Sequence, residues 1–243
     1  MIPIADNIRT PSRPIVVYVL IGIHVALFLR SLQLQVAGEL GDFLRTWSLV
    51  PVRIYSSALE VANTNNPAAW VTLIVIGSVS LIWGMFLHGS LAQLLGNMLF
   101  LWVFGKNVEH ILGHWRFLGF YLLAGIMTQI GQVLIQPNMT ASLAGANGAI
   151  AAILGGYLLS FPKARIDSIM PLIIVSIPMK ISAFFYLLWW FLQQFFYGIG
   201  KLNVVGGINP LFSIGYWSHG IGLIIGAALV PLLVKRKPPT AIY

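Results

Sequence analysis

Four polar side chains lie in segments that are otherwise almost wholly apolar, and their types suit hydrogen bonding and proton transfer. Gln93 and Asn97 are one helical turn apart in LAQLLGNM, so they share a helix face. Asn147 lies among glycines in GANGAIAAILGG, and His219 precedes another glycine-rich apolar run, GIGLIIG. A histidine can act as a general base, and carboxamides can donate hydrogen bonds to a developing oxyanion. These residue types indicate a polar pocket inside an apolar protein.

The composition identifies the setting of that pocket as a membrane. The chain has 243 residues, of which 58% are hydrophobic and 8% are charged, whereas about a quarter of the residues of a soluble domain are charged. The absence of cysteine excludes disulfides, thiolate zinc sites and cysteine nucleophiles. The formal charge of +8 is better explained by topology signals and by contacts with anionic lipid headgroups than by a nucleic-acid partner.

We expect six membrane-spanning helices, each needing about 20 apolar residues, near residues 15–29, 88–105, 117–135, 145–161, 181–197 and 216–234. This divides the chain into a cytoplasmic N-terminal segment (1–13), a membrane domain (14–234) and a cytoplasmic C-terminal tail (235–243). Residues 69–87 are also long and apolar enough to span. We expect them to lie in a partly membrane-embedded outer loop, although the choice between six and seven spans stays open.

The orientation follows from the distribution of lysine and arginine. With both termini in the cytoplasm, nine basic residues fall inside and four outside, and Lys180 lies near the inner edge of the fifth span. The inside set is Arg9, Arg13, Lys106, Arg116, Lys163, Arg165, Lys235, Arg236 and Lys237, and the outside set is Arg30, Arg45, Arg53 and Lys201. This agrees with the positive-inside rule and predicts cytoplasmic termini.

Small residues at helical spacing predict which spans pack together. The fourth span carries Gly148, Ala152 and Gly156 on one face, and the sixth carries Gly222 and Gly226. Such stripes let two helix backbones approach closely. If they pack together, Asn147 and His219 meet in the outer third of the membrane, with Asn97 nearby. Spacing alone leaves a second interpretation open, because carboxamides and histidines in membrane bundles often only bond neighbouring helices.

Four motifs in order resemble the rhomboid family of intramembrane serine proteases. They are the stretch from FLHGSLAQLLGNML to RFLGFYLLAG (residues 86–125), GANGAI, IPMKISAFFYLLWWFLQQFFYG and SHGIGLIIG. The resemblance covers about residues 14–234. It implies an all-α polytopic membrane protein, a six-helix rhomboid bundle, with a serine–histidine dyad below the outer membrane surface. It also implies substrates that are transmembrane helices.

Carried over residue by residue, the resemblance puts Asn147 at the position of the nucleophilic serine and His219 at that of the general base. It makes Asn97 an oxyanion donor and puts His88 at the mouth of the site. Gln93 stands where a second oxyanion histidine is expected. The departure at Asn147 decides the chemistry, because the nitrogen lone pair of an amide is delocalised and acyl transfer needs a hydroxyl or thiol beside the base.

We therefore predict a rhomboid-family protein that engages the transmembrane helices of client proteins without peptide-bond hydrolysis, because Asn147 replaces the serine nucleophile. The alternative is an active intramembrane serine endopeptidase, which requires another serine such as Ser142 or a native serine at position 147. A small transporter ranks last, because the charged pairs and broken helices of coupled transporters are missing from the sequence.

No cofactor is expected and no metal site is assigned. The segment HILGH places His110 and His114 four residues apart beside Glu109, but it lacks the glutamate that follows the first histidine in zinc hydrolases. We expect an integral, multi-pass protein of a bacterial inner or plasma membrane.

Overall fold

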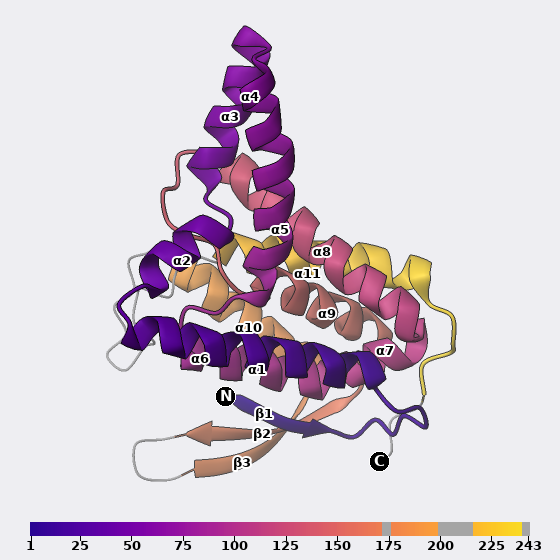
Figure 1. Ribbon diagram of the computed structural model, residues 1–243. Helices are drawn as coiled ribbons and strands as arrows, with labels where there is room; N and C mark the ends of the chain where they lie inside the picture. Colours follow the sequence, from indigo (N-terminus) through magenta and orange to yellow (C-terminus); the bar gives the residue numbers. More distant parts are fainter. Residues whose placement is uncertain (172–175, 199–215, 240–243) are drawn as a thin grey trace.

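The computed structural model describes residues 1–171, 176–198 and 216–239. Lys201 and the last four residues of the expected C-terminal tail lie outside this part of the chain. The described chain is mostly helical, with a small sheet along one side of a helical bundle (Figure 1). The predicted helical membrane fold is confirmed, and three described helices are long and apolar enough to cross a membrane: Ile15–Val36, Pro67–Phe86 and His114–Ile135.

The bundle is built from the segments that the sequence predicted as spans. Its helices are α1 (Ile15–Val36), α6 (Leu91–Phe100), α8 (His114–Ile135), α9 (Asn147–Ser160), α10 (Ala183–Gly198) and α11 (Tyr216–Leu233). Helix α6 continues through the π-helical segment η2 (Leu101–Gly105) into α7 (Lys106–Leu112), which ends at Gly113 with a φ of 80°. Every residue of α9 from Gly148 to Tyr157 is buried, as expected for a helix that is apolar on all sides and central in its bundle.

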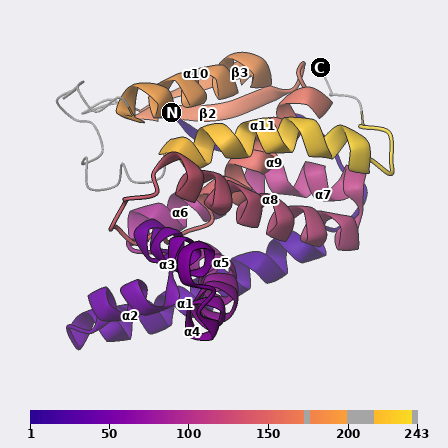
Figure 2. The same cartoon turned by 90° about the horizontal axis from the view of Figure 1, so that it is seen from above.

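The connection between α1 and α6 contains a helical hairpin. The connection comprises α2 (Leu40–Trp47), α3 (Pro51–Thr64), α4 (Pro67–Val71), the π-helical segment η1 (Thr72–Ile76) and α5 (Gly77–Phe86), and the hairpin is formed by α3 to α5. Asn65 makes the turn in the left-handed region, with a φ of 50°, and the Asn66 side chain caps α4 by accepting a hydrogen bond from the Ala68 amide. Figures 1 and 2 show α3, α4 and α5 projecting from the bundle, crosswise to α1 and α8.

A three-stranded antiparallel sheet is present that the all-α prediction missed. Strand β2 (Arg165–Pro171) pairs on one side with β1 (Ile2–Asp6) and on the other with β3 (Ser176–Ser182). Ile2 lies opposite Ile169, and Asp167 lies opposite Lys180. Period-2 alternation is weak in these strands, so nothing in the sequence distinguished them from interfacial coil. The N-terminal segment, which we had separated from the membrane domain, is hydrogen-bonded to it.

Asp6 anchors this N-terminal strand to the bundle. Its carboxylate is fully buried and lies 3.2 Å from the Lys106 ammonium. The Tyr157 hydroxyl donates to Oδ2 at 2.7 Å, and the Asn107 side-chain amide donates to the same oxygen. Burial raises the pKa of the Asp6 carboxyl, and the positive charge of Lys106 and the hydrogen bond from Tyr157 oppose that rise. The anchor therefore joins β1 to α7 and α9.

Helices α9 and α11 contact each other through their small residues. A methyl group added at Gly222 would lie 2.4 Å from the carbonyl oxygen of Gly148, and one added at Gly226 would lie 1.8 Å from that of Ala152. A methyl group at Gly156 would lie 2.3 Å from a Val230 methyl. These distances leave no room for side chains, so the close approach of the two backbones requires glycine at these positions.

Candidate functional site

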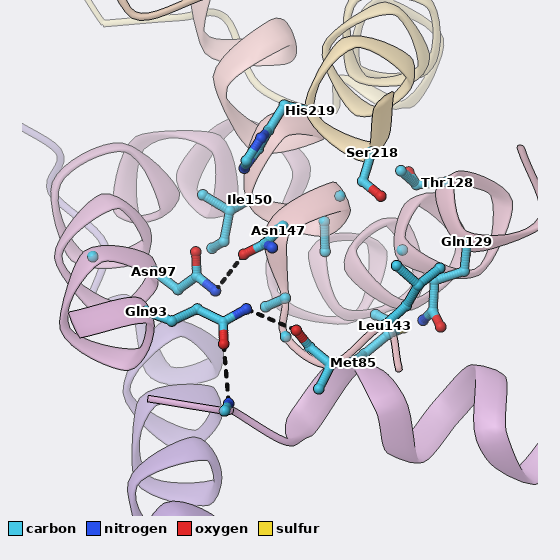
Figure 3. Close-up of a pocket in the computed structure, with 18 of the residues that line it drawn as sticks. Met85, Gln93, Asn97, Thr128, Gln129, Leu143, Asn147, Ile150, Ser218 and His219 are labelled. Atoms are coloured by element: carbon cyan, nitrogen blue, oxygen red, sulfur yellow. Dashed lines mark hydrogen bonds between the residues drawn. The ribbon is translucent and has the colours of Figure 1, made fainter. Parts of the chain in front are cut away.

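A cavity of about 410 Å³ lies between α6, α9, α11 and the segment that leads into α9. Its lining brings together the four polar residues singled out from the sequence: Gln93, Asn97, Asn147 and His219. Figure 3 shows Gln93 and Asn97 on one side of the cavity, Asn147 at its centre and His219 on α11. The volume falls in the range of about 300–1,000 Å³ that is usual for binding pockets.

Asn147 is the first residue of α9, and its side chain is bound to α6. The side-chain nitrogen of Asn97 donates to Oδ1 of Asn147 at 3.0 Å (Figure 3). The same nitrogen lies 3.1 Å from Nε2 of His88. Because the amide nitrogen carries two protons and no lone pair to offer, His88 accepts at Nε2 and carries its own proton on Nδ1. Asn97 thus links the start of α9 to a buried histidine.

His88 lies behind the cavity, so its expected place at the mouth of the site is wrong. The side chain is fully buried and is not part of the cavity lining. Its ring meets that of His24 edge-on, with centroids 5.1 Å apart, and Nε2 of His24 lies 2.8 Å from the Tyr121 hydroxyl. The backbone turns into α6 just after position 88, which directs this side chain into the bundle rather than towards its opening.

His219 faces the cavity from α11, one helical turn before Gly222. Its ring meets Trp190 edge-on at a centroid distance of 5.1 Å, and Nδ1 is buried without a hydrogen-bond partner in the described residues. No described hydrogen bond joins His219 to Asn147. The two side chains share the cavity because Gly222 contacts the backbone of Gly148, the residue that follows Asn147.

Gln93 holds the segment that leads into α9. Its side-chain nitrogen donates to the carbonyl oxygen of Ala144 at 2.7 Å, and its carbonyl oxygen accepts from the Gly89 amide at 3.0 Å. A methyl group added at Gly145, which has a φ of 118°, would lie 2.3 Å from that nitrogen. One of the two Gln93 amide protons is therefore used by the backbone, so the side chain positions the loop as well as lining the cavity.

The comparison with known proteins agrees with this architecture. The family model described as "Rhomboid domain" matches residues 76–236, which include α5 to α11 and the whole cavity lining except Leu44. The chain belongs to the rhomboid family.

Two curated relatives of this rhomboid-family chain illustrate the range of its similarity. It is 43% identical over 72 residues to the Rhomboid protease GluP of Bacillus subtilis (strain 168), an alignment that covers 30% of this chain and 14% of that protein. It is 29% identical over 105 residues to the human Presenilin-associated rhomboid-like protein, mitochondrial, covering 42% of this chain and 26% of that protein. The aligned stretches therefore span about a quarter or less of these relatives.

Two serines of the rhomboid-family chain also line the cavity. Ser142 lies in the segment before α9, and Ser218 precedes His219. The Ser218 hydroxyl donates to the side-chain oxygen of Gln132 at 3.2 Å. No described hydrogen bond joins either serine to His219. Among the described residues, neither hydroxyl has the contact with a base that would activate it as a nucleophile.

Helix α8 contributes polar groups that sequence reasoning missed. Thr128 and Gln129 line the cavity, and Gln132 binds Ser218. The side-chain nitrogen of Gln129 donates to the carbonyl oxygen of Leu81 at 2.7 Å, whereas its oxygen is buried without a described partner. The sequence could have indicated these residues, because polar side chains inside a membrane span are costly and usually face the bundle interior.

The HILGH segment of this rhomboid-family chain has a structural role. Both carboxylate oxygens of Glu109 accept from backbone amides in the first turn of α1, that of Val16 at 2.9 Å and that of Val17 at 2.8 Å. Nδ1 of His114 lies 2.5 Å from the same carboxylate. This carboxylate supplies the cap that α1 lacks locally, and a negative charge is favourable at a helix N-terminus. In the part of the chain that the structure describes, no group of three or more His, Cys, Asp or Glu residues could hold a metal ion.

Proposed function

We propose that this rhomboid-family membrane protein binds the transmembrane helices of client proteins without hydrolysing their peptide bonds. The observation that carries the proposal is Asn147 at the first turn of α9, facing a cavity shared with His219. By the family resemblance, this position belongs to the nucleophilic serine. A carboxamide cannot form an acyl-enzyme with a histidine base, so the cavity retains a binding surface and lacks the reacting group.

The hydrogen bonds of Asn147 support a binding role. Its Oδ1 accepts from Asn97, so the side chain is held by α6 rather than by His219. Asn97 is itself 8% exposed and bonded to the buried His88. Ordered polar groups at the floor of an apolar site give orientation and specificity to what binds there.

An active endopeptidase remains the second candidate, because Ser142 and Ser218 line the same cavity. The hydrogen bond from Ser218 to Gln132 turns that hydroxyl towards α8. A hydrolytic reaction through either serine would need a different arrangement of His219 from the one observed.

The binding function can be tested with the full-length protein in lipid nanodiscs and a labelled single-span peptide. We expect saturable binding and an intact peptide after prolonged incubation, as checked by mass spectrometry. A peptide of equal length that lies on the membrane surface serves as the control. Absence of saturable binding would contradict the proposal, and cleavage that survives Asn147→Ala would favour the endopeptidase.

The proposed orientation has both termini in the cytoplasm and the α3–α5 hairpin on the outer side, where it lies along the membrane without crossing. The charge distribution and the crosswise course of the hairpin support this (Figures 1 and 2). Because the chain has no cysteine, Asn65→Cys and Lys237→Cys each introduce a unique thiol. An impermeant thiol reagent added from outside should label Asn65→Cys only. Labelling of both variants from the same side would instead favour seven spans.

The basic residues assigned to the cytoplasmic side are proposed to contact anionic lipid headgroups, in a bacterial inner or plasma membrane. Fractionation of the source cells would check the membrane, and binding to vesicles with and without anionic lipid would check the contact. Equal recovery in both lipid compositions would exclude the lipid preference.

A further inference from the structure

The cavity presents a hydrogen-bond acceptor and a hydrogen-bond donor that the protein itself does not use. Asn97 donates both of its amide protons, one to Asn147 and one to His88, so its carbonyl oxygen is left without a described partner. Asn147 accepts through its oxygen, so its amide nitrogen keeps two protons without a described partner. Figure 3 shows these two carboxamides side by side in the cavity.

The Asn97 side-chain nitrogen lies between two acceptors, Nε2 of His88 and Oδ1 of Asn147. It lies 3.1 Å from the histidine nitrogen and 3.0 Å from the Asn147 oxygen, so both of its protons are used. A flip of the Asn97 amide alone would place two carbonyl oxygens together at Asn147, and these would repel each other. The two acceptors therefore leave the Asn97 oxygen available to the cavity, although the buried His88 does not line the cavity itself.

The charge of the lining disfavours charged partners for this pair of groups. Among the described lining residues, His219 is the only one with a titratable side chain, and none is Asp, Glu, Lys or Arg. A carboxylate or ammonium entering the cavity would lose its hydration without meeting a counter-charge. A purely apolar side chain would leave both carboxamides unsatisfied, which is also unfavourable. A neutral group with a donor and an acceptor on separate atoms can reach both residues at once, and a primary carboxamide has this pattern, whereas a hydroxyl carries both functions on one oxygen.

We propose that the cavity recognises an asparagine or glutamine side chain that projects from a client transmembrane helix. This rests on the proposed function and specifies the class of client. A carboxamide is costly in lipid, so a helix that carries one gains by finding partners in another protein. The incoming amide donates to the Asn97 oxygen, and its oxygen accepts from the Asn147 nitrogen.

The test compares single-span peptides that differ at one position. At one position in the outer third of the span, three peptides carry Gln, Leu or Glu. The set is repeated with this position moved along two successive helical turns, so that one position matches the depth of the cavity. Binding to the full-length protein in nanodiscs is measured by energy transfer. At the best position, we expect the Gln peptide to bind about 5- to 20-fold more tightly than the Leu peptide, the range that interhelical carboxamide bonds support.

The decisive variant is Asn147→Leu, which has a similar volume and removes the two amide protons without placing a charge in the cavity. We expect it to abolish the preference for Gln over Leu. Gln35→Leu, the same loss of a carboxamide at an exposed residue of α1 outside the cavity, should leave the preference unchanged. Asn147→Ala provides a second, smaller variant if Asn147→Leu does not fold.

Each remaining outcome has a defined meaning. Equal binding of the Gln and Leu peptides overturns this inference and leaves the proposed function standing, whereas no binding by any peptide overturns the proposed function as well. A preference for Gln that persists in both Asn147 variants places recognition outside the cavity and overturns the inference. Glu peptides that bind as tightly as Gln peptides at neutral pH would overturn it too, because the selectivity would then be for polarity in general.

Discussion

Asn147→Ser is expected to create a protein that a fluorophosphonate probe labels, whereas the parent protein remains unlabelled. Residue 147 begins α9, and the contact between Gly148 and Gly222 brings that turn beside His219. The substitution supplies the hydroxyl that the cavity lacks, and the histidine can then act as its base. Labelling is measured by in-gel fluorescence of the purified full-length protein.

Two further variants identify the groups responsible for that labelling. His219→Ala in the Asn147→Ser background should abolish it, because an unassisted serine hydroxyl is a poor nucleophile. Gln93→His in the same background tests oxyanion stabilisation, where one donor is typically worth about 10²–10³ in rate. We expect a smaller gain, since this change also removes the bond from Gln93 to Ala144. Labelling that is indifferent to His219 would mean that the two residues do not cooperate.

Gly226→Ala is expected to separate α9 from α11 and to destabilise the protein severely. The added methyl group would lie 1.8 Å from the carbonyl oxygen of Ala152 and 2.6 Å from its Cα. Both are backbone atoms, so no side chain can rotate away and the helices themselves must move. Overpacking of a tight core typically costs about 1–3 kcal/mol, and we expect a loss at or above the upper end of that range. The thermal unfolding midpoint in detergent measures it.

A matched glycine on another span controls for the effect of the methyl group itself. Gly22 lies within α1, and nothing lies within 4 Å of a methyl group added there. Gly22→Ala should therefore be neutral or stabilising by up to about 1 kcal/mol, the usual difference between the two residues in a helix. An unfolding midpoint for Gly226→Ala equal to that of the parent would show that the two backbones are less closely packed than described.

The sequence predicted the membrane setting and the helical fold because both depend on local properties of the chain. Long apolar runs with few charges require helices in a bilayer, where each backbone amide must be satisfied within its own segment. Polar residues inside those runs, such as Asn97, Asn147 and His219, were conspicuous for the same reason. The replacement of a hydroxyl by a carboxamide at position 147 is likewise visible without coordinates, and it limits the chemistry wherever the side chain lies.

Only the tertiary structure decided how those side chains are used. Whether Gln93 faces a ligand or holds Ala144 depends on a residue about 50 positions away in the chain. The bond between Asn97 and Asn147 likewise joins residues about 50 positions apart. His88 was expected at the mouth and is buried against His24. The pairing of β1 with β2, and the burial of Asp6 beside Lys106 and Tyr157, also join distant segments. Local patterns can indicate that a polar group needs a partner, but the packing of the whole bundle selects that partner. Each hydrogen bond requires both groups to be brought together in the right orientation.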